Sequence, residues 1–563
     1  MKDQLPRTTS KETKEDKVRV DRLIFVGALI LIFGLTFFVI LAQDTAKGIL
    51  GAIGAFNMNE LGWFYLIATF AALIFTIYVG FSDIGKIKMG APNEKPEYST
   101  FSWIAMLFCA GQGSSIIYWG TIEWGYYMLT PPPGYAPMSV EAADVALSAA
   151  FLHWGPSTWA LYLLPTLGMT YLYWRRRDPI LRLSLSLGGV IPNKVLRGKT
   201  GSVIDLIILF VIVVSYVATL GLGTPMIATG LEYFFNIPQT IYTQIAIVAA
   251  WSLVFGTSVY RGLDRGIQSL SRLNAYIAFF FLGLVFVLGN PAGIMNKISD
   301  TFANLLHNYC KWSLFTDSLG QSGFAQSWTI FYFAWVISAC TFMGLWVARI
   351  SRGRTIREIV CAELIVCSSC AFTIFGVLGS YGIRQQMLGG LDIVNVLETQ
   401  GPTYAVVYML TSLPLGKIVL ALMLITMFIN LATSLDSTAF VLAQLSCNNL
   451  KLGEEPPRWW RMFWAAALVT MPIGLILVGA DLATLQSFIL TPALPTTIFL
   501  ILMAVSFYKM VKEDRGLSYR QIVINHYKKN KPEVSLENVN RMLEQVDEDT
   551  NDNEDCKTEI IKE

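Results

Sequence analysis

Charged residues are scarce in this chain. Only 15% of its 563 residues are Asp, Glu, Lys or Arg, against roughly 25% in an average soluble domain. The positive and negative charges nearly cancel, which leaves a formal net charge of +2. So small a charge offers no electrostatic footprint for nucleic acid, and we expect no nucleic-acid partner. The composition excludes an ordinary soluble protein, and the lipid bilayer is the expected solvent.

Histidine is also rare, with three copies in the whole chain. Only His307 is expected near an outer surface, and no metal-binding pattern of His and Asp accompanies it. A membrane-embedded enzyme, such as an acyltransferase, would need a nucleophile or an acid–base cluster there. We therefore expect no catalytic residue, no cofactor and no metal held by such side chains. Glu123 and His153 lie in apolar runs and act either as proton sites or, as we expect, as satisfied structural groups.

Long apolar segments are what the sequence does contain. Hydrophobic residues make up 54% of the chain, and about twenty of them in a helix cross the roughly 30 Å of hydrocarbon in a bilayer. The pattern predicts an all-α membrane protein with about twelve transmembrane helices. We expect them near residues 22–42, 62–82, 101–128, 143–174, 201–234, 239–259, 272–289, 325–349, 356–383, 417–446, 460–479 and 483–509.

Basic residues concentrate in alternate loops between these segments. The loops that hold them carry Lys86, Lys88, Arg175, Arg176, Arg177, Arg261, Arg265, Arg349, Arg352, Arg354, Arg458 and Arg461. Cytoplasmic loops close to membrane helices carry such an excess of Lys and Arg. We therefore expect a multi-pass protein of the cell (inner or plasma) membrane with both termini in the cytoplasm.

Segments outside the expected spans differ in character. Residues 293–324 are mixed polar and apolar with helical spacing, which predicts a helix lying along the outer interface. Residues 511–563 are charged and end in an acidic run, which indicates a solvated tail, with a regulatory role as the alternative. The chain is thus divided into a cytoplasmic N-terminal tail (1–21), two extra membrane helices (22–100), a first helical repeat (101–292), the interfacial helix (293–324), a second repeat (325–510) and a cytoplasmic C-terminal tail (511–563).

Two stretches of small and polar residues interrupt the apolar pattern at membrane depth. Residues 108–115 include Gly111 and Gly113, which favour local unwinding and expose backbone carbonyls that can hold a cation. Residues 433–437 contain three hydroxyls and an acid. Lipid cannot satisfy such groups, so they line a pathway or mark close packing between helices, and the spacing leaves both open.

Aromatic residues crowd the fourth and eighth expected helices. The crowded positions are Trp154, Trp159 and Tyr162 in the fourth and Trp328, Phe331, Tyr332 and Trp335 in the eighth. A quaternary ammonium has no N–H to donate, so a protein holds it chiefly by ring faces, each worth about 0.5–2 kcal/mol. The crowding suits an aromatic cage, although any single aromatic is more often a core residue.

The segment Gly262–Asn274 resembles the signature of the betaine/carnitine/choline transporter family. Further resemblances to that family follow in order at residues 101–108, 119–123, 153–156 and 348–358, so that only the two tails fall outside. The regions around Tyr126, at 328–332 and at 453–457 most resemble the carnitine/γ-butyrobetaine antiporter branch.

This resemblance implies a LeuT-type core of two inverted five-helix repeats, set after two N-terminal helices, and a homotrimer. It also implies a substrate cage made of Trp154, Trp159, Tyr162, Trp335, Tyr126 and Met343. Val336 stands where relatives place a second tryptophan, and Ala339 where a further aromatic is common. The cage is open on that side, which leaves betaine, carnitine, γ-butyrobetaine and choline as candidate solutes.

The resemblance further implies an ion site. Positions that hold sodium in coupled members are matched here by Cys109, Gln112, Thr433 and Ser434. The antiporter branch carries an arginine in place of the ion, and the matching Asn274 is neutral. We therefore expect a secondary transporter that couples uptake of a small quaternary-ammonium solute to sodium. Sodium-independent exchange, such as carnitine for γ-butyrobetaine, is the alternative.

Overall fold

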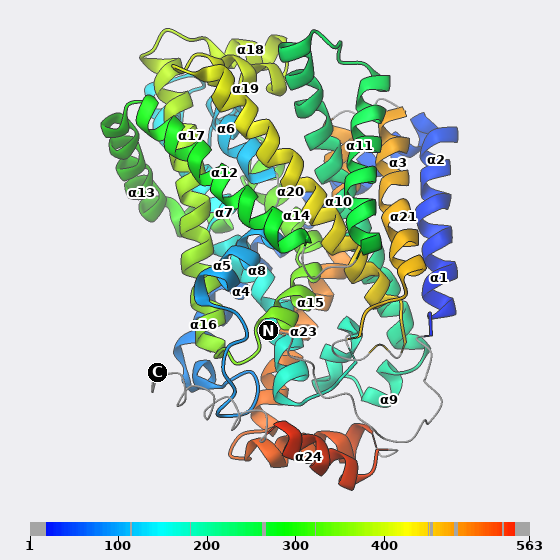
Figure 1. Ribbon diagram of the computed structural model, residues 1–563. Helices are drawn as coiled ribbons and strands as arrows, with labels where there is room; N and C mark the ends of the chain where they lie inside the picture. The colour runs from blue at the N-terminus through cyan, green and yellow to red at the C-terminus, as the bar shows by residue number, and fades with distance from the viewer. Residues whose placement is uncertain are drawn as a thin grey trace, which may run out of the picture.

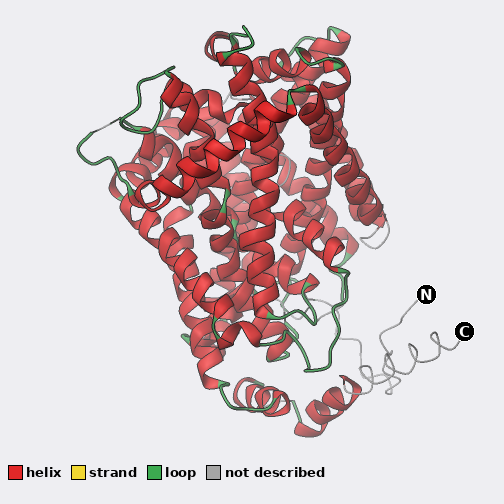
Figure 2. Cartoon of the chain, turned by 90° about the vertical axis from the view of Figure 1, so that its left-hand side faces the viewer, coloured by secondary structure: helices red, strands yellow, loops and turns green. Residues whose placement is uncertain are grey.

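The computed structural model describes residues 19–112, 115–180, 182–261, 266–320, 322–448, 450, 454–477, 482–531 and 534–546. Within these ranges the chain consists of helices joined by short loops (Figure 2). The β pairing recorded in the same ranges is two isolated bridges, Val20 with Cys447 and Lys88 with Thr355. The prediction of an all-helical protein is confirmed for this part of the chain.

The N-terminal part forms helices that pack against later parts of the chain. They are α1 (Arg22–Leu29), the π-helical turn η1 (Ile30–Gly34), α2 (Leu35–Leu41), α3 (Gln43–Ala55), the π-helical turn η2 (Phe56–Glu60), α4 (Gly62–Phe81) and the 3-10 turn η3 (Asp83–Lys86). Helix α1 packs on α10 (Lys199–Phe235), α2 on α21 (Arg458–Leu477), α3 on α22 (Leu482–Leu490) and α4 on α8 (Pro156–Thr170). The first helix begins at a cap, because the Asp21 carboxylate accepts the backbone N–H of Leu23 at 2.9 Å. This bond satisfies one of the donors that a helix start leaves free.

The next part contains the first half of the predicted core. Its elements are α5 (Thr100–Gln112), α6 (Ser115–Leu129), α7 (Val140–Trp154), α8 (Pro156–Thr170), η4 (Tyr171–Arg175), η5 (Leu183–Gly189), α9 (Asn193–Leu196), α10 (Lys199–Phe235), α11 (Ile241–Arg261), α12 (Gly266–Leu288) and α13 (Pro291–Leu314). Helix α5 continues through Gly111, so this glycine is helical, whereas Gly113 lies outside the described residues.

The single helix expected over 143–174 is broken at Gly155, between α7 and α8. Pro156 takes the first position of α8, where its missing N–H costs no hydrogen bond. A Cβ at Gly155 would lie 2.5 Å from the backbone oxygen of Phe151 and 2.9 Å from the Phe372 ring. Only glycine fits at this break. Trp154, before the break, belongs to α7, and Trp159, after it, belongs to α8.

The remaining part contains the second half of the predicted core and, after it, helix α24 of the expected tail. Its elements are η6 (Ala325–Ile330), α14 (Phe331–Ala339), α15 (Thr341–Ile350), α16 (Ile356–Cys361), the π-helical turn η7 (Ala362–Cys367), α17 (Ser368–Met387), α18 (Ile393–Thr399), α19 (Pro402–Thr411), α20 (Gly416–Leu445), α21 (Arg458–Leu477), α22 (Leu482–Leu490), α23 (Ala493–Glu513) and α24 (Tyr519–Asn530). The segment expected as one helix over 325–349 bends by 51° between α14 and α15.

Membrane spans can be counted by length and composition. Five helices among the described residues are long and apolar enough to cross a bilayer, or up to seven if each of two bent pairs is one span. A multi-pass membrane protein is thereby supported, and the count of twelve stays a prediction. Helices lie over each of the twelve expected ranges, but several are broken or short of a full span.

Helix α13 covers the segment expected to lie along the interface. It begins at Pro291, just before the expected start at 293, where the Asn290 side chain caps it by accepting the N–H of Gly293. It ends at Leu314, short of the expected end at 324. It turns by 103° from the end of α12, the direction that a helix in the plane of the interface would take. Lys297 pairs with Asp144 at 2.8 Å, which fastens α13 to α7.

The basic loops meet at one end of the molecule, which we call the basic end and define by Lys88, Arg175 to Arg177, Arg352 and Arg354. Backbone bonds join two of these loops, since Met89 N–H donates to the Arg354 oxygen at 2.8 Å. Glu94, in the same loop as Met89, adds a third loop by pairing with Arg177 at 2.7 Å, and it also pairs with Arg352. Helices α9 and α24 lie at this end, whereas α18 and α19 lie at the opposite end (Figure 1).

Helix α24 is packed against the loop that follows α8. Asp178 of that loop is surrounded by His526 at 3.0 Å, Lys531 at 3.0 Å and Arg197 at 2.7 Å. Burial opposes ionisation of this carboxyl, but the His526 hydrogen bond and the nearby cations outweigh it and lower the Asp178 pKa. The start of the expected tail is therefore an ordered helix, and α23 runs on to Glu513, past the expected boundary at 510.

Candidate functional site

Trp154 and Trp335, two of the expected cage residues, meet where α7 ends and α14 passes. Their ring centroids lie 5.9 Å apart at an interplanar angle of 83°. Tyr332 and Phe375 complete this Trp154 group, with centroids 5.6 and 5.2 Å from that of Trp154. Trp335 and Tyr332 pack edge-to-face or tilted against their neighbours in this group, and Phe331 stacks on Trp335 at 6.2 Å. Trp335 and Ala339, one turn apart, are only half-buried.

Trp159 and Tyr162 form a second group at the start of α8. Their ring centroids lie 5.4 Å apart, and Phe108 of α5 stacks on Trp159 at 6.2 Å. The Tyr162 hydroxyl donates to the backbone oxygen of Gly111 at 2.9 Å. A Cβ at Gly111 would approach the Trp159 ring to 2.9 Å and the Met343 methyl to 3.5 Å. Met343 therefore joins this Trp159 group across the glycine.

Tyr126 stands apart from both groups. Its ring packs on Trp119 and Trp328, with centroids 6.2 and 5.4 Å away. Trp328 in turn stacks on Tyr332, a member of the Trp154 group, at 6.3 Å. The six expected cage residues therefore do not form one continuous cage. Trp154 and Trp335 form a pair, and Trp159, Tyr162 and Met343 form a trio. Tyr126 is linked to the pair only through Trp328 and Tyr332.

A polar network behind the Trp154 group was not foreseen from the sequence. Glu123 accepts hydrogen bonds from Tyr127 at 2.5 Å, from the Trp154 indole at 2.9 Å and from Tyr332 at 2.6 Å. His153 bonds Tyr127 at 2.7 Å and Thr329 at 3.0 Å. Both buried polar groups are therefore satisfied, as expected.

Glu123 also positions Trp154, because its carboxylate accepts the indole N–H and so fixes the direction of that ring. Sequence spacing held a partial signal for this role. Glu123 and Tyr127 are four residues apart on α6 and so share one face of that helix. Nothing in the spacing tied that face to Trp154 or Tyr332 on other helices.

The expected ion site lies on α20, and the structure describes part of it. The Thr433 hydroxyl donates to the backbone oxygens of Ile429 at 3.1 Å and Asn430 at 2.9 Å. Thr433 and Ser434 are half-buried. The side chains of Cys109 and Gln112 lie outside the described part of the chain, although α5 contacts α20.

Asn274, the position where an arginine would replace the ion, reaches α20. Its amide donates to the Asn430 side-chain oxygen at 2.8 Å, one turn before Thr433. The Asn274 side-chain oxygen is itself buried, with no hydrogen-bond partner among the described residues. A neutral amide pair therefore borders the hydroxyls of α20.

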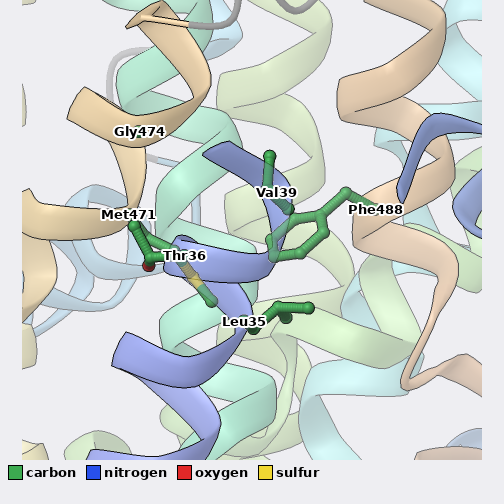
Figure 3. A pocket seen from close by; sticks show the side chains of 6 residues that line it. All are labelled: Leu35, Thr36, Val39, Met471, Gly474 and Phe488. Atoms are coloured by element: carbon green, nitrogen blue, oxygen red, sulfur yellow. The ribbon is translucent and has the colours of Figure 1, made fainter. Parts of the chain in front are cut away.

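A small apolar pocket lies elsewhere, between α2, α21 and α22. It is lined by Leu35, Thr36, Val39, Met471, Gly474 and Phe488 (Figure 3). None of these residues belongs to the aromatic groups or to the polar stretch of α20. Its lining offers no charge and no ring cluster for an ammonium, so we assign it no part in the candidate site.

Comparisons with known proteins identify the family that this chain resembles. The profile of a family described as BCCT, betaine/carnitine/choline family transporter, matches residues 23–516. One relative is the protein named "Uncharacterized transporter YeaV" of Escherichia coli (strain K12). It is 34% identical over 472 residues, which cover 83% of this chain and 96% of that protein.

Proposed function

This chain belongs to the betaine/carnitine/choline transporter family, and from that premise we propose that it takes up a small quaternary-ammonium solute together with sodium. The family match includes both aromatic groups and the whole of α20. The protein is a transporter in a membrane that it crosses several times, and it is not an enzyme. The solute, the coupling ion and the orientation are the parts that we propose.

The contact between Trp154 and Trp335 carries the solute proposal. Trp154 is the last residue of α7, at its break from α8, and Trp335 lies in the middle of α14, before the bend to α15. A trimethylammonium head offers no hydrogen-bond donor, so ring faces are its natural partners, and a desolvated site strengthens each contact. Glu123 adds to this effect, because a carboxylate that accepts the indole N–H makes the Trp154 ring richer in electrons.

The choice among quaternary-ammonium solutes depends on the open side of the Trp154 group. Val336 and Ala339 are small where a tryptophan or another aromatic would narrow the site. The buried Trp159 indole N–H has no acceptor among the described residues, and a carboxylate on the solute would supply one. We therefore favour a solute with a carboxylate, namely glycine betaine, carnitine or γ-butyrobetaine, over choline.

Sodium coupling is proposed from the chemistry around α20. The expected site offers hydroxyl and carbonyl oxygens, the ligands that a hard cation prefers. Asn274 bonds Asn430 as a neutral amide, so the position that carries an arginine in the antiporter branch is neutral here. Exchange without an ion would need such a positive charge, and the neutral pair therefore favours symport.

We place the basic end in the cytoplasm, because basic loops remain on that side of a membrane. We propose that substrate and sodium shift the protein between outward-open and inward-open states by rocking of two inverted repeats. The repeats would comprise α5 to α12 and η6 to α23, and the family resemblance adds a homotrimer.

Uptake into proteoliposomes tests the proposal. Labelled glycine betaine, carnitine, γ-butyrobetaine and choline are each offered with and without an inward sodium gradient, and with and without solute inside. We expect uptake of at least one carboxylated solute that rises with the sodium gradient and needs no internal solute. Flux that requires only internal solute would instead establish exchange and remove the sodium role of Thr433 and Ser434.

A further inference from the structure

Glu363 is a buried acid that the proposed transport cycle does not yet use. It lies in the π-helical turn η7, within the membrane helix Ile356–Met387, and none of its surface is exposed. Both of its carboxylate oxygens are buried without a hydrogen-bond partner among the described residues. This is the opposite of Glu123, which accepts three hydrogen bonds. Single π-helical turns inside α-helices occur frequently at functional sites.

The direction of the Glu363 side chain excludes a surface role. Ile365 and Ser369 mark the outer face of this helix, since both are exposed. Glu363 shares the inner face with Cys367, and both are fully buried. Glu363 also lies seven residues after the start of α16, about 10 Å along the helix from the basic end. It therefore cannot reach the headgroups by extending along the outside of the bundle.

Helices α5 and α8 pack against η7 and bring it no charge. Neither helix contains an acidic or basic residue. The titratable residue on α8 is Tyr162, whose hydroxyl donates to the backbone oxygen of Gly111. The titratable residue on α5 is Cys109, whose side chain lies outside the described residues.

The charged groups on the flanking turns are engaged elsewhere. Arg357 donates to the backbone oxygens of Gly80 and Ser82, and Glu358 caps α16 through Thr355. The remaining titratable residues on these turns and on η7 are Cys361, Cys367, Cys370, Tyr381 and Arg384. Tyr381 bonds Ser412, and Arg384 lies in the last turn of α17, beyond Tyr381.

Among the described residues, a carboxylate here would have neither a cation nor a hydrogen-bond donor beside it, which is far less favourable than the neutral acid. We propose that Glu363 is a proton-binding site of the transport cycle. It holds a proton while it is packed beneath α5 and α8, and it releases that proton when movement of these helices admits water. The proton comes from water on one side of the membrane and returns to water on the other, so no further reactant is needed.

The link to the solute follows from which helices cover the acid. Helix α8 carries Trp159 and Tyr162, and α5 carries Phe108 and Gly111, so the Trp159 group is built on the same two helices that pack on η7. A movement that opens one site must disturb the other. Solute and proton affinities then depend on each other by reciprocal linkage. This inference requires only that the chain is a transporter, and it holds for any solute and coupling ion.

Infrared spectroscopy tests the protonated state without any transport. Purified protein in lipid is compared with Glu363→Gln, and with Glu398→Gln as a matched control at an exposed acid on α18. We expect a carbonyl band of a protonated, buried carboxylic acid near neutral pH that is lost in Glu363→Gln and kept in Glu398→Gln. Identical spectra for the wild type and Glu363→Gln would overturn the proposal.

Binding and flux test the coupling. Solute affinity is measured from pH 5 to 8, on the order of the range in which perturbed carboxyl groups titrate, at saturating sodium. We expect a severalfold change with pH in the wild type and in Glu398→Gln, and a flat response in Glu363→Gln, which mimics the neutral acid. A pH-sensitive dye inside the vesicles should report solute-dependent proton movement that Glu363→Gln abolishes.

A second variant covers the case in which Glu363→Gln does not fold. Glu363→Asp keeps the acid on a shorter side chain, so its pH midpoint should shift relative to the wild type. A wild-type affinity that is flat with pH, or a Glu363 variant that keeps the wild-type midpoint, would overturn the proposal. Failure of all solutes to be transported would count against the proposed function, whereas the infrared band would still decide the state of Glu363.

Discussion

Acidic residues have different surroundings at the basic end and inside the helical bundle. At the basic end, Glu94 and Asp178 are buried but each is paired with two or more cationic side chains. Inside the bundle, Glu123 is held by neutral donors, and Glu363 has no partner among the described residues. The loops use charge to fasten segments together, whereas the membrane interior uses single acids among rings and hydroxyls.

This difference separates structural acids from functional candidates. A buried carboxylate with several partners stabilises the packing that supplies them, and its loss leaves those partners unsatisfied. A buried carboxyl without partners stabilises nothing in the same way, so its presence needs another reason. The same reasoning distinguishes Glu123 from Glu363, although both are fully buried glutamates in membrane helices.

The largest expected effect contrasts these two glutamates. Glu123→Leu leaves the donors on Trp154 and Tyr332 buried and without that acceptor, at about 1–3 kcal/mol each, while Tyr127 keeps its hydrogen bond to His153. We expect a strong fall in the thermal unfolding temperature in lipid nanodiscs. Glu363→Leu removes the acceptor of no hydrogen bond among the described residues. It should leave the unfolding temperature unchanged or raise it. Equal destabilisation by the two substitutions would contradict the comparison.

The next effect concerns the rings that face the solute. Replacing Trp335 or Trp154 by Leu removes one ring face, and we expect solute affinity to weaken by more than about tenfold. Trp459→Leu is the control, because Trp459 is exposed on α21, outside the aromatic groups. Equilibrium binding of labelled solute is the measurement, and unchanged affinity in Trp335→Leu would remove this residue from the site.

A smaller effect is expected at α20. Thr433→Ala removes one proposed oxygen ligand, and the sodium concentration for half-maximal uptake should rise severalfold while solute affinity at saturating sodium stays close to that of the wild type. Thr470→Ala is a matched control, because Thr470 also bonds a carbonyl of its own helix but is exposed on α21. An unchanged sodium dependence in Thr433→Ala would exclude this hydroxyl from the ion site.

The smallest effect near neutral pH concerns the docking of α24. Burial lowers the pKa of His526, so the protein binds fewer protons when α24 is docked than when α24 is released. Docking therefore weakens once the pH falls below about 6.5. The pKa of Asp178 is also lowered, by its hydrogen bond to His526 and by its cations despite burial. Its contribution is complete above about pH 4 and is lost as the pH falls further.

Hydrogen exchange of residues 519–530, corrected for its intrinsic pH dependence, measures this docking. We expect protection to decline in two stages on acidification, and the lower stage to disappear in Asp178→Asn. Protection that increases toward acid pH would show that the ion pairs of Asp178 do not hold the helix.

Much of the fold could be predicted from periodicity and length. Helices occupy every expected range, because an apolar run in a bilayer has no alternative to internal backbone hydrogen bonds. The break at Gly155 was missed because Trp154 and Trp159 read as residues of one continuous helix. The sequence shows the Gly–Pro pair, but the close approach of Phe372 that demands glycine comes from another helix.

The candidate site was predicted less completely. The resemblance supplied Trp154 and Trp335, which do meet, and also Tyr126, which joins them only through Trp328 and Tyr332. Spacing along one helix could not reveal contacts between helices, so the role of Glu123 in orienting Trp154 was unforeseen. Glu363 gave no signal, because a lone acid in an apolar run does not show whether it has partners.

The short backbone pairing at the basic end has a mechanical consequence. Met89 bonds Arg354 and Gly353, and the Ile356 N–H donates to Ile87 at 3.0 Å, immediately where α16 begins. These bonds anchor one end of the long helix that carries Glu363 to the loop after α4. Any displacement that preserves them must swing the helix about this fixed point. The displacement of the helix is then smallest beside these bonds and greatest toward α18. A small tilt at the basic end therefore moves the opposite end of the helix much further.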